Sequence, residues 1–117
     1  MPLNANGRSH VLVVDDQPDN LLILEDMLGE EHAVHTADSG REALAWVEGG
    51  EPVDLVLLDV MMPDLDGFEV CRRLKANAAV RDIPVIFLTT LQSADDEERG
   101  LSLGAEDFIH KPFTPAV

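Results

Sequence analysis

The residues of this sequence that could carry out chemistry stand at the ends of its predicted strands. Four apolar runs are each followed by polar side chains: an acidic pair, a single carboxylate, a hydroxyl group and an ammonium group. These side chains belong to Asp15, Asp16, Asp59, Thr89 and Lys111. Because the carboxyl ends of parallel strands lie along one edge of a sheet, where such folds bind ligands, we expect the five side chains to meet there. Their meeting point is the predicted functional site.

Three carboxylates held close together repel one another unless a cation neutralises them. A hard divalent cation held by few protein oxygens and several waters suits Mg²⁺, with metal–oxygen distances of about 2.0 to 2.1 Å. The Lys111 ammonium adds a second positive charge and the Thr89 hydroxyl adds a donor, so the group suits the spread charge of a transferring phosphoryl group. Asp59 is the predicted nucleophile, because it ends the central strand and a carboxylate can form an acyl phosphate.

Strand and helix patterns alternate along the chain. The predicted strands are Val11 to Val14, His32 to Ala37, Leu55 to Leu58, Val85 to Leu88 and Phe108 to Ile109. The predicted helices are Pro18 to Leu28, Arg41 to Val47, Phe68 to Leu74, and an acidic helix that Ser93 to Asp96 cap and that ends at Leu103. Proline at a first helical position, a capping box at Ser39 and Glu42, and glycines after the helices mark these boundaries.

This alternation predicts an α/β protein with a doubly wound parallel sheet, because right-handed crossovers place helices on both of its faces. The flavodoxin-like strand order 2-1-3-4-5 is the natural arrangement of five such strands. In that order, the strands that end at Asp15-Asp16 and at Asp59 are neighbours at the point where the strand order reverses. All three carboxylates are therefore expected in one pocket.

Length and composition predict one small cytoplasmic domain. With 117 residues, 45% of them hydrophobic, the chain can bury one core, predicted over residues 10–117 after a flexible arm of residues 1–9. A net charge of −15 disfavours direct binding of nucleic acid and of anionic membranes. The sequence shows no signal region and no apolar run of membrane length. The single cysteine, Cys71, agrees with a reducing compartment and is interpreted as a packing residue.

The end of the sequence carries the start of a helix pattern. Thr114-Pro115 has the form of an N-cap followed by proline at the first helical position, and Val117 is the last residue. We therefore expect the last helix of the fold to be missing from this chain. Apolar surface should then remain on the sheet face that the first helix covers only in part, filled by a neighbouring chain or exposed.

The motifs around the five polar residues resemble those of a known family. They are Val13-Val14-Asp15-Asp16, Leu58 to Gly67, Leu88-Thr89-Thr90 and Lys111-Pro112-Phe113, in this order and at this spacing. Together they resemble the receiver domain of two-component response regulators, from about His10 to Phe113. The resemblance implies that a sensor histidine kinase or phosphotransfer protein phosphorylates Asp59. The domain would then switch conformation to control an output domain or downstream protein, with homodimer formation left open.

The resemblance also implies a set of metal ligands. Mg²⁺ would be bound by the carboxylates of Asp16 and Asp59 and by the backbone carbonyl of Met61, with Asp15 acting mainly through a bound water. A domain of this kind is a phosphoacceptor and not otherwise an enzyme, because it catalyses only its own phosphorylation and slow autodephosphorylation. The segment from Phe108 to Pro115 is similar to receivers attached to cyclic-dinucleotide enzymes.

Further residues would contact the phosphoryl group or respond to it. By the same resemblance, Thr89 and Lys111 would contact the group, and Phe108 stands where the family keeps its aromatic switch residue. When the Thr89 hydroxyl turns toward the phosphoryl group, it would leave space into which Phe108 rotates. Met61 and Leu91 occupy two positions that influence attack of water on the phosphoaspartate. Since neither side chain can orient a water, we predict slow self-dephosphorylation.

Other interpretations of these residues are open. Asp64, Asp66 and Gly67 are better explained as loop and helix-start residues than as ligands. A phosphohydrolase of the haloacid dehalogenase type would need a carboxylate two positions after Asp59, where Met61 stands. A flavin-binding module would need a phosphate loop after the first strand in place of two aspartates. The remaining alternative is a phosphorylation-independent pseudo-receiver that only binds partners.

Overall fold

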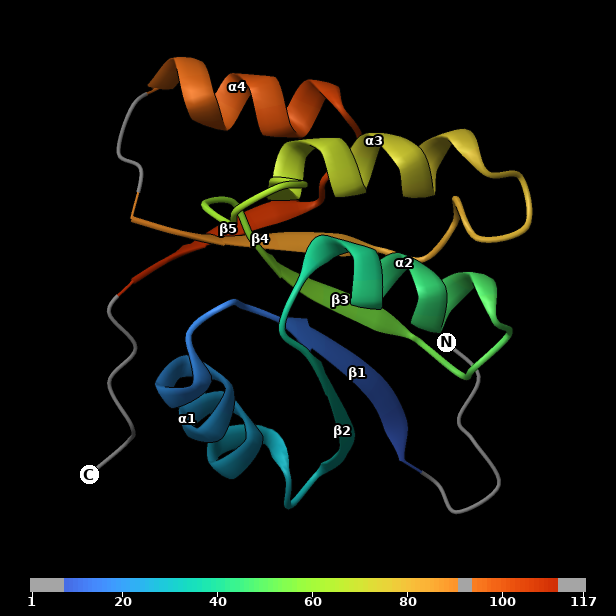
Figure 1. The fold of residues 1–117 in the computed structure, drawn as a ribbon, viewed down its shortest axis with the longest axis vertical. Helices are drawn as coiled ribbons and strands as arrows, with labels where there is room; N and C mark the ends of the chain where they lie inside the picture. The colour runs from blue at the N-terminus through green and yellow to red at the C-terminus, as the bar shows by residue number, and fades with distance from the viewer. Residues whose placement is uncertain (1–7, 91–93, 112–117) are drawn as a thin grey trace.

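The computed structural model describes residues 8–90 and 94–111, which form a five-stranded parallel sheet flanked by helices (Figure 1). The strands are β1 (Ser9–Val14), β2 (His32–Ala37), β3 (Leu55–Asp59), β4 (Val85–Thr89) and β5 (Asp107–His110). The helices are α1 (Pro18–Leu28), α2 (Gly40–Glu48), α3 (Gly67–Ala76) and α4 (Ala94–Ser102). The strand order is β2-β1-β3-β4-β5, so the predicted fold class and strand order are confirmed.

The sheet separates two apolar cores. Figure 1 shows α2, α3 and α4 on one side of the sheet and α1 on the other. Leu12 and Val14 of β1 enter the core beneath α2 and α3, whereas Val11 and Val13 enter the core beneath α1. Because successive side chains of a strand point to opposite faces, a strand covered on both faces is apolar throughout. This explains the continuous apolar run of β1 from Val11 to Val14.

Two helix starts are fixed by side chains that the sequence identified. The Ser39 hydroxyl accepts a hydrogen bond from the Glu42 N–H at 3.1 Å, and the Asp66 carboxylate accepts one from the Glu69 N–H at 2.9 Å. Each contact satisfies a backbone donor that the first helical turn leaves unpaired. The interpretation of Asp66 as a helix-start residue is therefore confirmed. The predicted cap at Ser93 lies outside the described residues.

Strand β1 begins two residues earlier than its apolar run. Ser9 pairs in register with His32 of β2, and the His10 N–H donates to the Asp54 carboxylate at 2.7 Å. These contacts join segments far apart in the sequence, so the apolar pattern alone does not reveal them. Ser9, which was predicted to belong to the N-terminal arm, is therefore part of the sheet, and residues 1–7 of that arm lie outside the described residues.

The sheet face that carries α1 is covered only in part. Beside α1 lies an apolar groove of about 230 Å³, whose lining includes Leu28, Ile86 and Ile109. Ile109 is 41% exposed. The apolar surface expected on this face is thus present, while the predicted helix start at Thr114-Pro115 lies outside the described residues. No described helix combines the length and apolar character needed to cross a membrane.

Cys71 lies in α3, within the core on the opposite face of the sheet. It is buried, and burial raises the pKa of its thiol. A thiol with a raised pKa is a poor nucleophile at neutral pH. The interpretation of Cys71 as a packing residue is confirmed.

Candidate functional site

Backbone hydrogen bonds bring the ends of the five strands to one edge of the sheet. The Asp15 N–H donates a hydrogen bond of 3.1 Å to the carbonyl of Ala37, the last residue of β2. The Val60 N–H donates one of 3.1 Å to the carbonyl of Leu88 in β4. The Lys111 N–H donates to the Thr89 carbonyl at 2.9 Å. Pairing thus continues up to the residues that carry the polar side chains. Their meeting at one edge follows from the parallel sheet itself.

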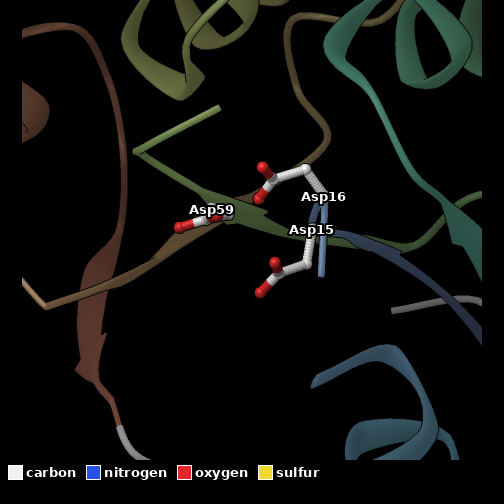
Figure 2. A group of neighbouring side chains, drawn as sticks. All are labelled: Asp15, Asp16 and Asp59. Atoms are coloured by element: carbon white, nitrogen blue, oxygen red, sulfur yellow. The ribbon is translucent and has the colours of Figure 1, made fainter. Parts of the chain in front are cut away.

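Three carboxyl groups meet at this edge. Asp15 and Asp16 follow β1, Asp59 ends β3, and one oxygen from each lies within 4.8 Å of the others. Figure 2 shows the three side chains projecting toward the same side from the ends of these two strands. Asp15 and Asp59 are buried, with 0% and 3% of their surface exposed, whereas Asp16 is half-buried. The predicted acidic pocket is therefore present in the structure.

Lys111 joins two of these carboxylates. Its Nζ lies 2.8 Å from Oδ2 of Asp15 and 3.2 Å from Oδ1 of Asp59, and its side chain is only 11% exposed. Apart from this ion pair, Asp15 Oδ2 has no polar partner among the described residues. The sequence predicted a cation opposite the carboxylates, but it did not predict that one ammonium group would bridge both buried aspartates.

Short turns hold the carboxylates in place. Asp15 Oδ1 accepts a hydrogen bond from the Gln17 N–H at 3.0 Å, which is the turn that aspartate favours before a helix. Asp59 Oδ1 accepts a longer one from the Met61 N–H at 3.4 Å. Each of these oxygens is thereby oriented by the backbone two residues further along the chain.

Gly67 packs directly against the backbone of Asp59. A Cβ at this position would collide with the Asp59 carbonyl, and the Gly67 N–H donates to the Val60 carbonyl at 2.9 Å. The first turn of α3 therefore packs directly against the end of β3. From the sequence alone, Gly67 is expected only as a loop and helix-start residue. The available signal was a glycine directly after the Asp66 cap, where most other residues favour a helix more strongly.

The site carries more negative than positive charge. Burial, followed by the charge of Asp15, raises the pKa of Asp59 to about 6, although Lys111 acts in the opposite direction. Burial alone would lower the pKa of Lys111, but its contacts with Asp15 and Asp59 outweigh burial and raise that pKa. Three carboxylates thus face one ammonium group in a largely buried space. Such an oxygen-rich, negatively charged group suits a hard divalent cation.

The remaining predicted site residues lie on β4, on β5 and directly after β3. Thr89 ends β4 and is fully buried, and the side chain of Met61 is exposed. Phe108 lies in β5, beside Phe87 of β4, and the centroids of their rings are 5.3 Å apart. Thr89 and Phe108 therefore belong to neighbouring strands that lead from the acidic pocket toward α4.

Comparison with known proteins gives the family. A model described as the response regulator receiver domain matches residues 11–117. The chain belongs to this family. The receiver is 42% identical over 114 residues to a probable cyclic di-GMP phosphodiesterase from Vibrio cholerae, a match that covers 97% of this chain and 26% of the relative. It spans less than half the length of further curated relatives as well, among them the response regulator PleD from Caulobacter vibrioides.

Two solved structures share the fold of the receiver. One is a BeF3-activated DrrB receiver domain, with a TM-score of 0.80 and 33% identity, covering 92% of this chain and 88% of that one. The other is the Mn²⁺-bound form of the response regulator Rcp1, with a TM-score of 0.81 and 26% identity, covering 91% and 83%. A relative of this fold thus holds a divalent cation, which agrees with the acidic group found here.

Proposed function

We propose that the receiver accepts a phosphoryl group on Asp59 in a Mg²⁺-dependent reaction. The observation that carries this proposal is the position of Asp59: it is buried, grouped with Asp15 and Asp16, and contacted by Lys111 at 3.2 Å. The donor would be a sensor histidine kinase or a phosphotransfer protein. The phosphorylated receiver would change its contacts with an output domain or a downstream protein.

Transfer requires Asp59 in its ionised form. An oxygen of the carboxylate attacks phosphorus, the bond between phosphorus and the donor atom breaks, and the leaving group keeps that electron pair. Even in the metal-free protein, where its pKa is raised to about 6, the Asp59 carboxyl group is largely ionised at neutral pH, and the ionised oxygen is the nucleophile. The product is an acyl phosphate whose negative charge the Lys111 ammonium partly offsets.

A cation would complete the site. Asp16 and Asp59 would hold Mg²⁺ together with the backbone carbonyl of Met61, and Asp15 would act through a bound water. The cation would neutralise the carboxylates and the oxygens of the phosphoryl group. Lys111 alone cannot do this, because its single charge already faces two buried aspartates.

Thr89 and Phe108 are proposed to carry the switch. Thr89 would turn its hydroxyl toward the phosphoryl group, and Phe108 would move into the space that this turn leaves. The half-buried position of Phe108 against Phe87 supports the proposal, because a ring at the margin of the core can move without opening it. Phosphorylation can shift the Phe108 ring only if the domain's conformations with the ring in each position differ in their affinity for the phosphoryl group.

The output is proposed to be a further domain of the same protein in the cytoplasm. A curated relative of similar sequence is named a probable cyclic di-GMP phosphodiesterase, and this chain covers only 26% of it. The sequence from Phe108 to Pro115 also resembles receivers attached to cyclic-dinucleotide enzymes. We therefore place the regulation of such an enzyme first among the outputs to test, ahead of direct binding of nucleic acid, which the charge of −15 disfavours.

The proposal is tested with acetyl phosphate, a small phosphoryl donor, and intact mass spectrometry. The wild-type protein should gain one phosphoryl group in the presence of Mg²⁺ and none in EDTA. Asp59→Asn should gain none, whereas the matched variant Asp64→Asn should behave as wild type, because Asp64 is exposed and paired with Arg41. Circular dichroism must first show that each variant is folded. A folded wild-type protein without the adduct would favour a pseudo-receiver that only binds partners.

A further inference from the structure

Helix α4 contacts the sheet at a position without a side chain. Gly100 is buried on α4, and a Cβ placed there would lie 2.5 Å from Cζ of Phe108. The same Cβ would lie 2.9 and 3.0 Å from two atoms of the Phe87 ring. Carbon atoms in contact are about 3.5 to 4.0 Å apart, so any larger residue at position 100 would have to displace a ring.

The two rings differ in their freedom to move. Phe87 is fully buried in β4, and its ring packs edge-on against Phe68 with centroids 5.3 Å apart. Phe108 is half-buried on the edge strand β5, and the far end of its ring is the part that faces Gly100. A methyl group at position 100 would therefore displace Phe108 and not Phe87.

Glycine at this position has a conformational disadvantage. In the interior of a helix, glycine is less favourable than alanine, because it loses more backbone freedom on folding. Gly100 lies in the last turn of α4 (Ala94–Ser102), two residues before its end, so alanine would stabilise this helix if packing were the same. The loss of helix stability is offset only if another group packs into the space that a side chain at position 100 would fill. Here that space is occupied by the Phe108 ring.

We infer that Gly100 is a positioning residue for the switch, because its lack of a side chain forms the slot between α4 and Phe87 that holds the Phe108 ring. This inference rests on the proposed function, in which a phosphoryl group at Asp59 favours one of two positions of the Phe108 ring. Because coupling between two sites is reciprocal, closing the slot that holds one of these positions must change the affinity for a phosphoryl group at Asp59. The size of residue 100 thus sets the strength of the response.

The packing part of the inference is tested by urea unfolding of four proteins: wild type, Gly100→Ala, Phe108→Leu and the double variant. Gly100→Ala should lower the unfolding midpoint when Phe108 is present, and should lower it less, or raise it, when residue 108 is leucine. Ser102→Ala, an exposed change on the same helix, serves as the control. If Gly100→Ala alone fails to fold and the double variant folds, the slot is supported. An equal shift in both backgrounds would overturn it.

The functional part is tested with beryllofluoride, which mimics a phosphoryl group on a carboxylate, in the presence of Mg²⁺. The affinity of Gly100→Ala for beryllofluoride should differ at least about fivefold from that of the wild type, and Ser102→Ala should leave the affinity unchanged. Wild-type affinity in folded Gly100→Ala would overturn the inference. If the wild-type protein neither binds beryllofluoride nor accepts a phosphoryl group, the proposed function fails, and the unfolding measurements still decide whether Gly100 positions Phe108.

Discussion

Replacement of Asp59 by asparagine should stabilise the metal-free protein at neutral pH. The pKa of this buried carboxyl is raised from 3.8 to about 6, first by burial and then by the charge of Asp15, against the attraction of Lys111. In the unfolded chain the carboxyl has its ordinary pKa. Since one pKa unit corresponds to about 1.4 kcal/mol, keeping Asp59 ionised in the folded protein costs about 3 kcal/mol.

The sign of this effect sets its pH dependence. Because the pKa is raised in the folded state, the cost is absent below the unfolded pKa of 3.8, grows between pH 3.8 and about 6, and is constant above that pH. Asparagine carries no charge and avoids this cost, which already includes the attraction to Lys111, but its amide must replace the hydrogen bonds of the buried carboxyl group. We therefore expect Asp59→Asn to gain about 2 kcal/mol of unfolding free energy near pH 7.5, and almost none near pH 4.

Urea and thermal unfolding in EDTA measure this difference. A gain of 2 kcal/mol should raise the melting temperature by about 8 °C in a domain of this size. Asp64→Asn is the control, because Asp64 is exposed and its hydrogen bond with Arg41 lowers its pKa, so its replacement should bring no gain. Added Mg²⁺ should stabilise the wild type but not Asp59→Asn. Equal stability near pH 7.5, or the same gain at both pH values, would refute this reasoning.

Gly67→Ala should lower the unfolding free energy by about 2 kcal/mol, because its Cβ would collide with the Asp59 carbonyl; an unchanged urea midpoint would show that α3 can shift freely. Met61→Asn should shorten the lifetime of the phosphoaspartate several-fold, since an amide can orient the attacking water, and intact masses recorded over time should show it. Decay within minutes in the wild type would contradict this account. Thr89→Ala should leave phosphorylation measurable but weaken its effect on the Phe108 ring signals in NMR spectra; an effect of wild-type size would exclude Thr89 from the switch.

The group of polar residues at the carboxyl edge of the sheet could be predicted because local sequence patterns show where each strand ends. Apolar runs of strand length end at Asp15, Asp59 and Thr89, and parallel pairing brings such ends together whatever the details of packing. The capping contact of Ser39 is also local, because its partner Glu42 is three residues away. Features of this kind follow from residue type and spacing alone.

Other features depend on contacts between distant segments. The bridge from Lys111 to both buried aspartates depends on the pairing of β5 with β4, and the early start of β1 depends on Asp54. Gly67 and Gly100 matter because of what lies against them, namely the Asp59 carbonyl and the Phe108 ring. A glycine in a sequence does not show which neighbour it accommodates, so these roles required the structure.

The central claim is that Asp59 itself forms the acyl phosphate, and chemical trapping tests it most directly. The protein is phosphorylated with acetyl phosphate and Mg²⁺ and then reduced with borohydride, which converts an aspartyl phosphate to homoserine. Peptide mass spectrometry should place homoserine at position 59 and at no other aspartate of the acidic pocket. Homoserine at Asp15 or Asp16, or an adduct that resists reduction, would contradict the account.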